Sequence, residues 1–278
     1  MSTGIIIQAR VGSRRLSEKI LKPLPFGSET TVLDQVIRRV KKTKKIDRII
    51  VATTKEPGAF RIEKIAKKNK VNCFRGDTDD VLNRYYQAAG KFSLSTVVRV
   101  TSDCPCIDWQ IIGKMIEIYE QGKYDYVSNS LKRTFPHGLD AEVFSFSVLE
   151  KAYLKAKRKD YREHVTPYIY CSRKFKVGDM LAGPGQCGPE IRITLDTDPD
   201  YVLLCAVYDL LYKRKKFFTA EDIVRLFKDR PWLKEINSGV SQKKLVNSLS
   251  QEIKEAIKVL DLQDLKRASQ VLRKFLHK

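Results

Sequence analysis

The chain has 278 residues, of which 42% are apolar, and a formal net charge of +20. It is long enough for one large domain, or a domain with an appendage, each with a buried core. No apolar run approaches the eighteen or so residues of a membrane span, and no signal peptide is recognisable, so we expect a cytoplasmic protein without a membrane partner. Six cysteines without CxxC spacing indicate neither a disulfide framework nor a zinc site.

A charge this large is compatible with a nucleic-acid partner, an anionic membrane surface or a polyanionic small substrate. The basic residues are spread over several clusters, KKTKK, KKNK, KAKRK and KRKK, and do not form one tract with interleaved aromatics. A dedicated nucleic-acid face is therefore not the leading interpretation.

The first predicted element is a buried strand at 5–7, three consecutive isoleucines that end at Gln8. A loop rich in glycine, serine and basic residues follows. Gly12 lets a ligand approach the backbone closely, and free N–H groups near Ser13 can face anionic oxygens. Fixed positive charge comes from Arg10, Arg14, Arg15 and Lys19. The pattern favours a polyphosphate cradle over a merely solvated basic loop.

Short apolar strands then alternate with amphipathic helices, which is typical of a mostly parallel sheet covered by helices on both faces. The sequence thus predicts a Rossmann-like α/β fold with three layers, α/β/α. Further strands are predicted at 49–52, 71–74, 97–100 and 124–127. Helices are predicted from apolar stripes that begin at Val32, Val81 and Ile111.

Ligands of such sheets bind beyond the carboxyl ends of the strands, and polar motifs follow the strands there: QAR, TTKE, RGDTDD and TSDCP. In the last motif Asp103 stands at a strand end. Its carboxylate suits Mg²⁺, which binds through one or two carboxylates plus substrate phosphates. Capping of a helix explains Asp103 equally well from the residues alone.

A second carboxylate cluster follows a less regular segment. The alternation loosens over about 129–175, which we interpret as an insertion beside the active crevice, before a strand predicted at 191–195 returns to the sheet. The motif LDTDPDY comes next, and helix capping explains one of its two later aspartates. Asp196 is nearest the strand end and could face Asp103 across a shared metal. Such carboxylates and a cationic loop are what metal-assisted attack on a nucleotide phosphate requires.

Two further features carry less weight. The motif GPGQCG at 183–188 matches G-x-G-x-x-G literally, but prolines flank it and a strand is predicted after it, so it is interpreted as a surface turn. His137 and His164 are in segments where a histidine is more often structural than a base, and His277 in the tail is uninformative.

Taken together, eight ordered motifs identify a family resemblance: IIIQARVGSRRLSEKIL, VATT, FRGDTDDVLNRYYQAA, VRVTSDCPCID, YDYVSN, RTFPHGLDAEVF, REHVTPYIY and ITLDTDPD. The chain resembles the CTP-dependent sugar-activating enzymes, the acylneuraminate and 3-deoxy-manno-octulosonate cytidylyltransferases. Within them it is most similar to the branch called spore coat polysaccharide biosynthesis protein F. The resemblance covers residues 5 to about 240 and implies a nucleotidyltransferase domain at 1–240, with 241–278 as a C-terminal helical extension.

The resemblance also implies roles for individual residues. The CTP triphosphate would be held by the first loop, through Ala9, Arg10, Gly12, Ser13, Arg15 and Lys19. The cytosine and ribose would face Thr53 and the segment from Gly76 to Arg84. Asp103 and Asp196 would bind Mg²⁺ and, with Arg10 and Lys19, form the catalytic set. The acceptor pocket would be lined by Asp140, Glu142, His164 and Thr166.

The implied reaction is attack by an acceptor oxygen on the α-phosphorus of CTP, giving a CMP-linked product and pyrophosphate without a covalent protein nucleophile. We expect an acidic sugar as acceptor, a role in surface polysaccharide or glycoconjugate biosynthesis, and a homodimer. Two alternatives stay open: a glycosyltransferase that uses a nucleotide sugar, and a non-catalytic basic protein that binds nucleic acid or other anions.

One departure from the family pattern lies in the first loop. Relatives generally carry Pro-Gly where Ser17 and Glu18 stand. The replacement predicts a less rigid loop and a negative charge beside the expected triphosphate.

Overall fold

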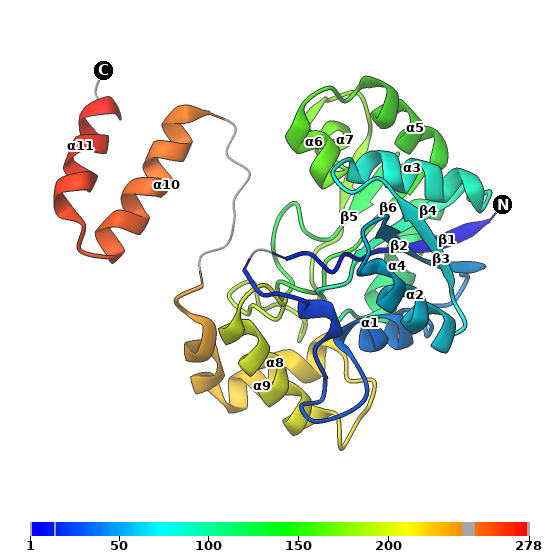
Figure 1. Ribbon diagram of the computed structural model, residues 1–278, viewed down its shortest axis with the longest axis horizontal. Coiled ribbons are helices and arrows are strands. Elements are labelled where there is room, and N and C mark those ends of the chain that lie inside the picture. Colours follow the sequence, from blue (N-terminus) through cyan, green and yellow to red (C-terminus); the bar gives the residue numbers. More distant parts are fainter. Residues whose placement is uncertain (1, 14, 241–247, 277–278) are drawn as a thin grey trace. The chain divides into compact units, whose positions relative to one another are not determined.

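The structure, a computed structural model, describes residues 2–13, 15–240 and 248–276. The chain divides into two compact units, residues 1–239 and residues 240–278 (Figure 1). Arg14 and His277, which the sequence analysis names, lie outside the described residues.

A seven-stranded sheet forms the centre of the larger unit, with strand order β3-β2-β1-β4-β6-β5-β7. Strands β1 to β4 are parallel, β6 runs antiparallel to both β4 and β5, and β7 is parallel to β5. The sheet is thus mostly parallel. The strands are β1 (Thr3–Gln8), β2 (Arg48–Thr54), β3 (Asn72–Gly76), β4 (Thr96–Thr101), β5 (Tyr126–Ser128), β6 (Glu142–Ser145) and β7 (Val177–Asp179).

Helices cover both faces of this sheet and bury two separate cores. Because side chains alternate along a strand, Ile5 and Ile7 of β1 pack into one core and Ile6 into the other. The first core is closed by α1 (Val32–Val40), α2 (Ala59–Lys68), α4 (Trp109–Glu120), α8 (Asp198–Leu211) and α9 (Ala220–Asp229). The second is closed by α3 (Val81–Lys91), α5 (Phe146–Lys155) and α7 (Pro167–Cys171), with α6 (Lys159–His164) beside them (Figure 1). Short 3₁₀ helices are η1 (Lys19–Leu21) and η2 (Pro231–Asn237).

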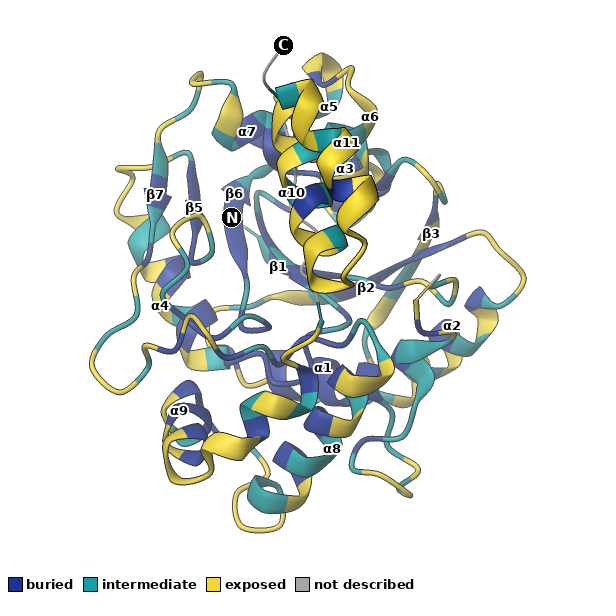
Figure 2. Cartoon of the chain, turned by 90° about the vertical axis from the view of Figure 1, so that its left-hand side faces the viewer, coloured by how far each residue is buried: buried dark blue, intermediate teal, exposed yellow. Residues whose placement is uncertain are grey.

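This architecture confirms the predicted α/β fold of three layers. The first five predicted strands each overlap an observed one, and the three apolar stripes are the buried faces of α1, α3 and α4. The central strands are among the most buried elements (Figure 2). The turn expected at 183–188 is also present, since these residues form an irregular, largely exposed turn.

The strand predicted at 191–195 is wrong. Ile191, Ile193 and Leu195 are buried, which gave the strand-like pattern, but the segment forms one isolated bridge, between His137 and Arg192. His137 N donates to Ile191 O and Ile193 N donates to His137 O, both at 2.8 Å. The neighbouring Gly138 has φ +116°, and a Cβ there would lie 2.7 Å from the Ile193 backbone. The segment therefore packs against a glycine turn and not against a strand.

The segment 129–175, interpreted from the sequence as an insertion, contributes one strand to the central sheet. It contains β6, which pairs with β4 on one side and with β5 on the other. These four residues are part of the central sheet, and α5 to α7 follow them over the second core. The strand was missed because four residues are too few to show a clear alternation.

The smaller unit is a helical hairpin of α10 (Leu249–Leu262) and α11 (Lys266–Leu276). Its interior includes Ile257 and Ser269, and Arg273 Nη2 lies 2.6 Å from Asp261 Oδ2 across the hairpin. Among the described residues, no helix combines the length and apolar character that crossing a bilayer would need.

Buried Arg39 ties the elements that carry the candidate site. It lies on α1 and is 1% exposed. Its Nε donates to Ile107 O at 2.7 Å, just after the Asp103 loop, and its Nη2 donates to Phe218 O, just before α9. The guanidinium also lies 4.4 Å from the centroid of the Phe218 ring. One side chain thus holds three separate segments together.

We expect the Arg39→Met substitution to lower the free energy of unfolding by roughly 3 kcal/mol, because it removes two charged hydrogen bonds and leaves two carbonyls unpaired. Urea denaturation followed by circular dichroism measures the change. Arg38→Met on the same helix is the matched control, since Arg38 is only half-buried, and it should change stability much less. Equal losses in the two variants would contradict the role given to Arg39.

Candidate active site

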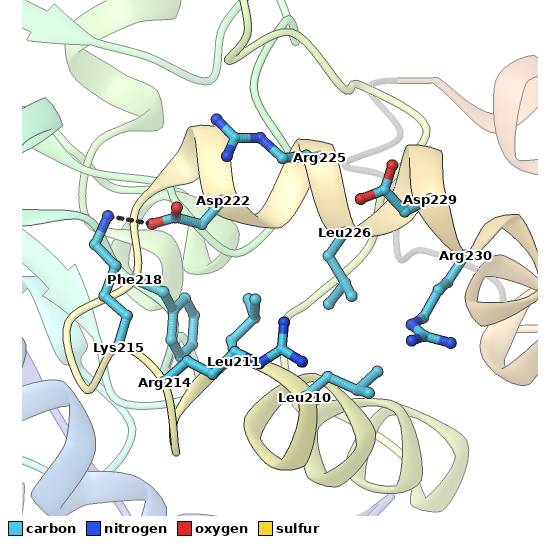
Figure 3. A pocket seen from close by; sticks show the side chains of 10 residues that line it. All are labelled: Leu210, Leu211, Arg214, Lys215, Phe218, Asp222, Arg225, Leu226, Asp229 and Arg230. Carbon is cyan, nitrogen blue, oxygen red and sulfur yellow. Dashed lines mark hydrogen bonds and ion pairs between the residues drawn. The ribbon is translucent and has the colours of Figure 1, made fainter.

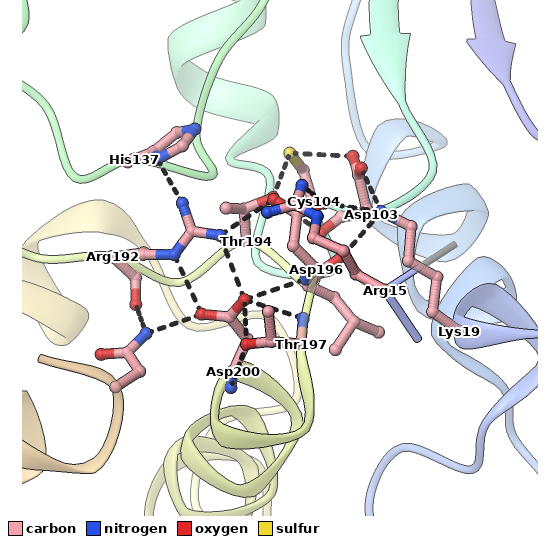
Figure 4. Close-up of polar contacts among 12 residues, drawn as sticks. Arg15, Lys19, Asp103, Cys104, His137, Arg192, Thr194, Asp196, Thr197 and Asp200 are labelled. Atoms are coloured by element: carbon pink, nitrogen blue, oxygen red, sulfur yellow. Dashed lines mark hydrogen bonds and ion pairs between the residues drawn. The ribbon is translucent and has the colours of Figure 1, made fainter. Parts of the chain in front are cut away.

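The candidate site is centred on Lys19, which begins η1 at the end of the first loop. Its Nζ lies 2.7 Å from Asp103 Oδ2, 3.0 Å from Asp196 Oδ1 and 2.7 Å from Leu195 O (Figure 4). An ammonium group has three donors, and all three are used here. The structure therefore brings the first loop, the end of β4 and the start of α8 to one point.

Asp103 is positioned by the turn that follows β4. Its backbone carbonyl accepts from Leu195 N at 2.8 Å, so the extended segment before α8 is fixed directly beside it. The alternative of helix capping does not describe Asp103, because the N-cap of α4 is Asp108, whose side chain accepts from Gln110 N. Asp103 is instead directed at Lys19.

Asp196 shares its two oxygens among three cations. Oδ1 faces Lys19 and, at 3.0 Å, Arg15, whereas Oδ2 lies 2.9 Å from Nη2 of Arg192. Arg192 is held in turn by Asp200, which also forms the capping box of α8 (Figure 4). The prediction that a later aspartate of the motif caps the helix is confirmed for Asp200.

Arg192 is a site residue that the sequence analysis missed. Its Nη1 lies 3.2 Å from His137 Nδ1, which must accept because a guanidinium only donates. The imidazole proton is therefore on Nε2, 3.7 Å from Asp140 Oδ2. Burial lowers the pKa of His137, so the ring is neutral at pH 7. In the sequence Arg192 is one arginine between two isoleucines, which does not distinguish it from the many other basic residues.

The charges of the cluster stabilise one another. Burial alone would raise the pKa of Asp103, but the charge and hydrogen bond of Lys19 outweigh it and lower the pKa to about 2. The pKa of Asp196 is also lowered, since Lys19 again outweighs burial. Burial would lower the pKa of Lys19, but the two carboxylates raise it. All three groups are thus ionised at neutral pH.

The carboxylates fit a metal ion that is shared with a ligand. Asp103 and Asp196 each place an oxygen within 3.0 Å of one cationic nitrogen, so they converge on a point that already stabilises positive charge. No three histidine, cysteine or acidic side chains among the described residues are grouped to hold a metal. This donor set suits Mg²⁺ completed by phosphate oxygens, and not a metal enclosed by protein ligands alone.

The loop before Lys19 is open to a ligand. Arg10 and Gly12 are exposed and Ser13 is half-buried, whereas Ala9 is buried and its N–H donates to Ala52 O. Among the residues that the structure describes, a Cβ on Gly12 would have only Glu56 Oε2 within 4 Å, at 3.9 Å. The backbone here is accessible, as an anion-binding loop requires.

Thr53 and Gly76 lie at the carboxyl ends of β2 and β3, and Arg84 lies in the first turn of α3, which follows β3. Gly76 pairs with Thr54 in the sheet, and a Cβ on it would lie 2.8 Å from Arg84 Cγ, so the glycine makes room for this arginine. Arg84 is fully buried, yet only its Nη1 is bonded, to Asp77 O at 2.8 Å. Within the described residues, Arg84 Nε and Nη2 and Thr53 Oγ1 have no partner. Buried unpaired polar atoms of this kind suit a ligand with its own polar groups.

The four residues expected around the acceptor lie in three places. Asp140 is bound by both terminal nitrogens of Arg133, and through His137 and Arg192 it is linked to Asp196. Glu142 and Thr166 are hydrogen-bonded to each other at 2.8 Å, in a buried network with Tyr126 and Arg99. His164 ends α6.

The side chain of Glu18 forms an ion pair with Arg61 outside the first loop. Glu18 has φ +53°, a left-handed conformation that favours glycine, and both of its carboxylate oxygens face Arg61 of α2, with Arg61 Nη1 at 2.9 Å. The negative charge expected beside the triphosphate is therefore compensated by Arg61, and the loop is tied to α2.

A separate hollow of about 500 Å³ lies between α8 and α9 (Figure 3). Its lining combines apolar, basic and acidic side chains, with Lys215 paired to Asp222 at 2.6 Å. None of the candidate site residues lines it, so it plays no part in the site around Lys19.

The left-handed conformation of Glu18 gives a test of the loop geometry. We expect Glu18→Gly to have a higher melting temperature than Glu18→Ala, because both lose the ion pair but only alanine keeps the strained φ. Ser17 is the matched control: there Ser17→Gly should melt below Ser17→Ala, since Ser17 does not have a positive φ. Differential scanning fluorimetry measures all four, and the same order at both positions would contradict this geometry.

The sequence of the chain is similar to those of known proteins. The sequence model of a family described as cytidylyltransferase matches residues 4–246. An uncharacterized protein of Methanocaldococcus jannaschii is 39% identical over 241 residues, 86% of this chain and 95% of that protein. The spore coat polysaccharide biosynthesis protein SpsF of Bacillus subtilis is 31% identical over 234 residues, 81% of this chain and 94% of its own.

A solved structure shows the same relationship. A cytidylyltransferase from Leptospira borgpetersenii superposes with a TM-score of 0.78 at 34% sequence identity, over 88% of this chain and 100% of the other. The family match includes the whole cluster around Lys19 and every other candidate site residue. These matches confirm the resemblance inferred from the ordered motifs. The chain belongs to the cytidylyltransferase family, in the branch that includes SpsF.

Proposed function

We propose that the protein transfers CMP from CTP to an acceptor sugar, with release of pyrophosphate, in the synthesis of surface polysaccharide or glycoconjugate. The observation that carries the proposal is the convergence of Lys19, Asp103 and Asp196 beside an exposed basic loop. The family match supports CTP as the nucleotide, and the name of the SpsF relative supports the biosynthetic role.

The triphosphate would be held by the first loop. Arg10 and the backbone near Gly12 and Ser13 are accessible to it, and Arg15 and Lys19 border the same space from the side of the carboxylates. Their positive charges would stabilise the leaving pyrophosphate, whose negative charge grows in the transition state. In this role the residues orient and neutralise, and none forms a bond to phosphorus.

Asp103 and Asp196 would hold Mg²⁺ together with phosphate oxygens. The ion would neutralise charge at the α-phosphate and lower the pKa of the attacking hydroxyl. Cys104, the nucleophilic side chain beside Asp103, is buried, and burial raises the pKa of its thiol well above the usual value. The thiol therefore stays protonated, which supports direct attack by the acceptor.

The remaining assignments extend outward from this centre. Thr53, Gly76 and Arg84 would receive the cytosine and ribose, and the unpaired buried donors of Arg84 support that role. Asp140, Glu142, His164 and Thr166 would form the acceptor side. The acceptor is proposed to be an acidic sugar, which the exposed Arg10 of the first loop would attract.

The larger organisation is proposed from the resemblance: a cytoplasmic homodimer with a nucleotidyltransferase domain at 1–240 and a helical extension at 241–278. The extent of the family match, residues 4–246, supports the length given to the domain.

We expect Asp103→Asn and Asp196→Asn to lower turnover at least about a hundredfold, because each removes charge at the centre of the reaction, while the fold is kept. Release of pyrophosphate from CTP, with Mg²⁺ and a panel of acidic sugars, measures the rate. Asp198→Asn is the matched control, since Asp198 belongs to the same motif but is exposed, and it should retain activity.

Two results would contradict the proposal. Failure of the wild-type protein to bind CTP in calorimetry would exclude a CTP-dependent activity. Strong, salt-sensitive binding of DNA or RNA that persists after substitution of Arg10 and Asp103 would favour the non-catalytic alternative.

A further inference from the structure

We propose that Lys19 closes the metal site in the nucleotide-free protein, so that a divalent cation enters only together with the triphosphate that draws Lys19 away. The inference rests on the proposed function and concerns the order in which the same site is filled. It starts from the position of the Lys19 ammonium group between the two carboxylates that would bind the metal.

The ammonium group occupies this position as a fully coordinated cation. Its three donors are taken up by Asp103, Asp196 and the Leu195 carbonyl, at distances of 2.7 to 3.0 Å. The side chain of Lys19 is only 14% exposed, so water has little access to the ammonium group and does not compete with these contacts. A metal ion bound by both carboxylates would have to take the place of the lysine nitrogen.

The charge of the surrounding cluster also disfavours a metal ion alone. Three carboxylates, of Asp103, Asp196 and Asp200, are matched by three cations, Lys19, Arg15 and Arg192. A dication added to this neutral cluster would be repelled by all three cations at short range. A triphosphate brings several negative charges, so nucleotide and metal together restore the balance.

Only the side chain of Lys19 has to move. The backbone of η1 is fixed, since Ile20 is buried, Leu21 N donates to Glu18 O at 2.8 Å, and Glu18 is paired with Arg61. Lysine carries its charge on a flexible four-carbon stem and binds phosphate readily. The expected phosphate ligands, Arg10 to Ser13, are on the same loop as Lys19. Lys19 can therefore exchange carboxylate partners for phosphate oxygens without rearrangement of the fold.

The test uses Mn²⁺ as the probe, without nucleotide, and follows its binding by electron paramagnetic resonance. The wild-type protein should bind Mn²⁺ weakly, whereas Lys19→Met should bind it at least about tenfold more tightly, because the carboxylates then lack their cation. Adding Asp103→Asn to Lys19→Met should abolish that gain. Lys22→Met is the matched control, since Lys22 lies over the Tyr201 ring outside the cluster, and it should bind Mn²⁺ as the wild type does.

Two outcomes would overturn the inference. One is tight Mn²⁺ binding by the wild-type protein without nucleotide that Asp103→Asn removes. The other is no gain in Mn²⁺ affinity in either Lys19→Met or Lys19→Gln, when circular dichroism shows at least one of them folded. Failure of the proposed function is seen separately, as absence of labelled-CTP binding to the wild type by equilibrium dialysis in the presence of Mg²⁺.

Discussion

The pairing of Lys19 with Asp103 and Asp196 is the interaction on which the arrangement of this site depends. The partners are 84 and 177 residues away from Lys19 in the sequence. Partly buried charges of this kind are costly unless each has a partner, so the ion pairs stabilise the contact among the first loop, the end of β4 and the start of α8. Because Lys19 is held by negative charge, an incoming phosphate can compete with the two carboxylates for it. The contacts that stabilise the empty site are therefore the ones that ligand binding would exchange.

The sheet supplies the geometry that the pairing needs. Parallel strands β1, β2, β3 and β4 end at one edge, and residues of the candidate site lie at or just after the carboxyl end of each strand. Asp196 reaches the same edge by another route, because its segment is anchored to the Asp103 backbone and not to a strand. The close approach of that segment to Gly138 requires a residue without a side chain. The parallel strands thus position the first loop and Asp103, whereas the turn at Gly138 positions the segment that carries Asp196.

Much of this was accessible from the sequence, and the exceptions have physical causes. The strands of the parallel half and the residues after them follow from apolar runs and from where such sheets bind ligands. Ile191, Ile193 and Leu195 gave the pattern of a strand because they are buried. Alternating apolar residues indicate that one side of an extended segment is buried, but not that the segment pairs with a strand. Arg192 and Arg61 could not be found, since their importance lies in contacts with Asp196 and Glu18 that only the tertiary structure creates.

The departure at Ser17 and Glu18 shows how a changed loop can keep its geometry. At Glu18, where the resemblance leads us to expect a glycine, this chain has a side chain in the left-handed region, which costs energy that glycine would not. The carboxylate of Glu18 offsets part of that cost through its paired contacts with Arg61. Because the contact joins the loop to α2, it also fixes the backbone from which Lys19 extends. The loop thus replaces a local conformational preference by a tertiary contact, and the ammonium group of Lys19 stays directed at the two carboxylates.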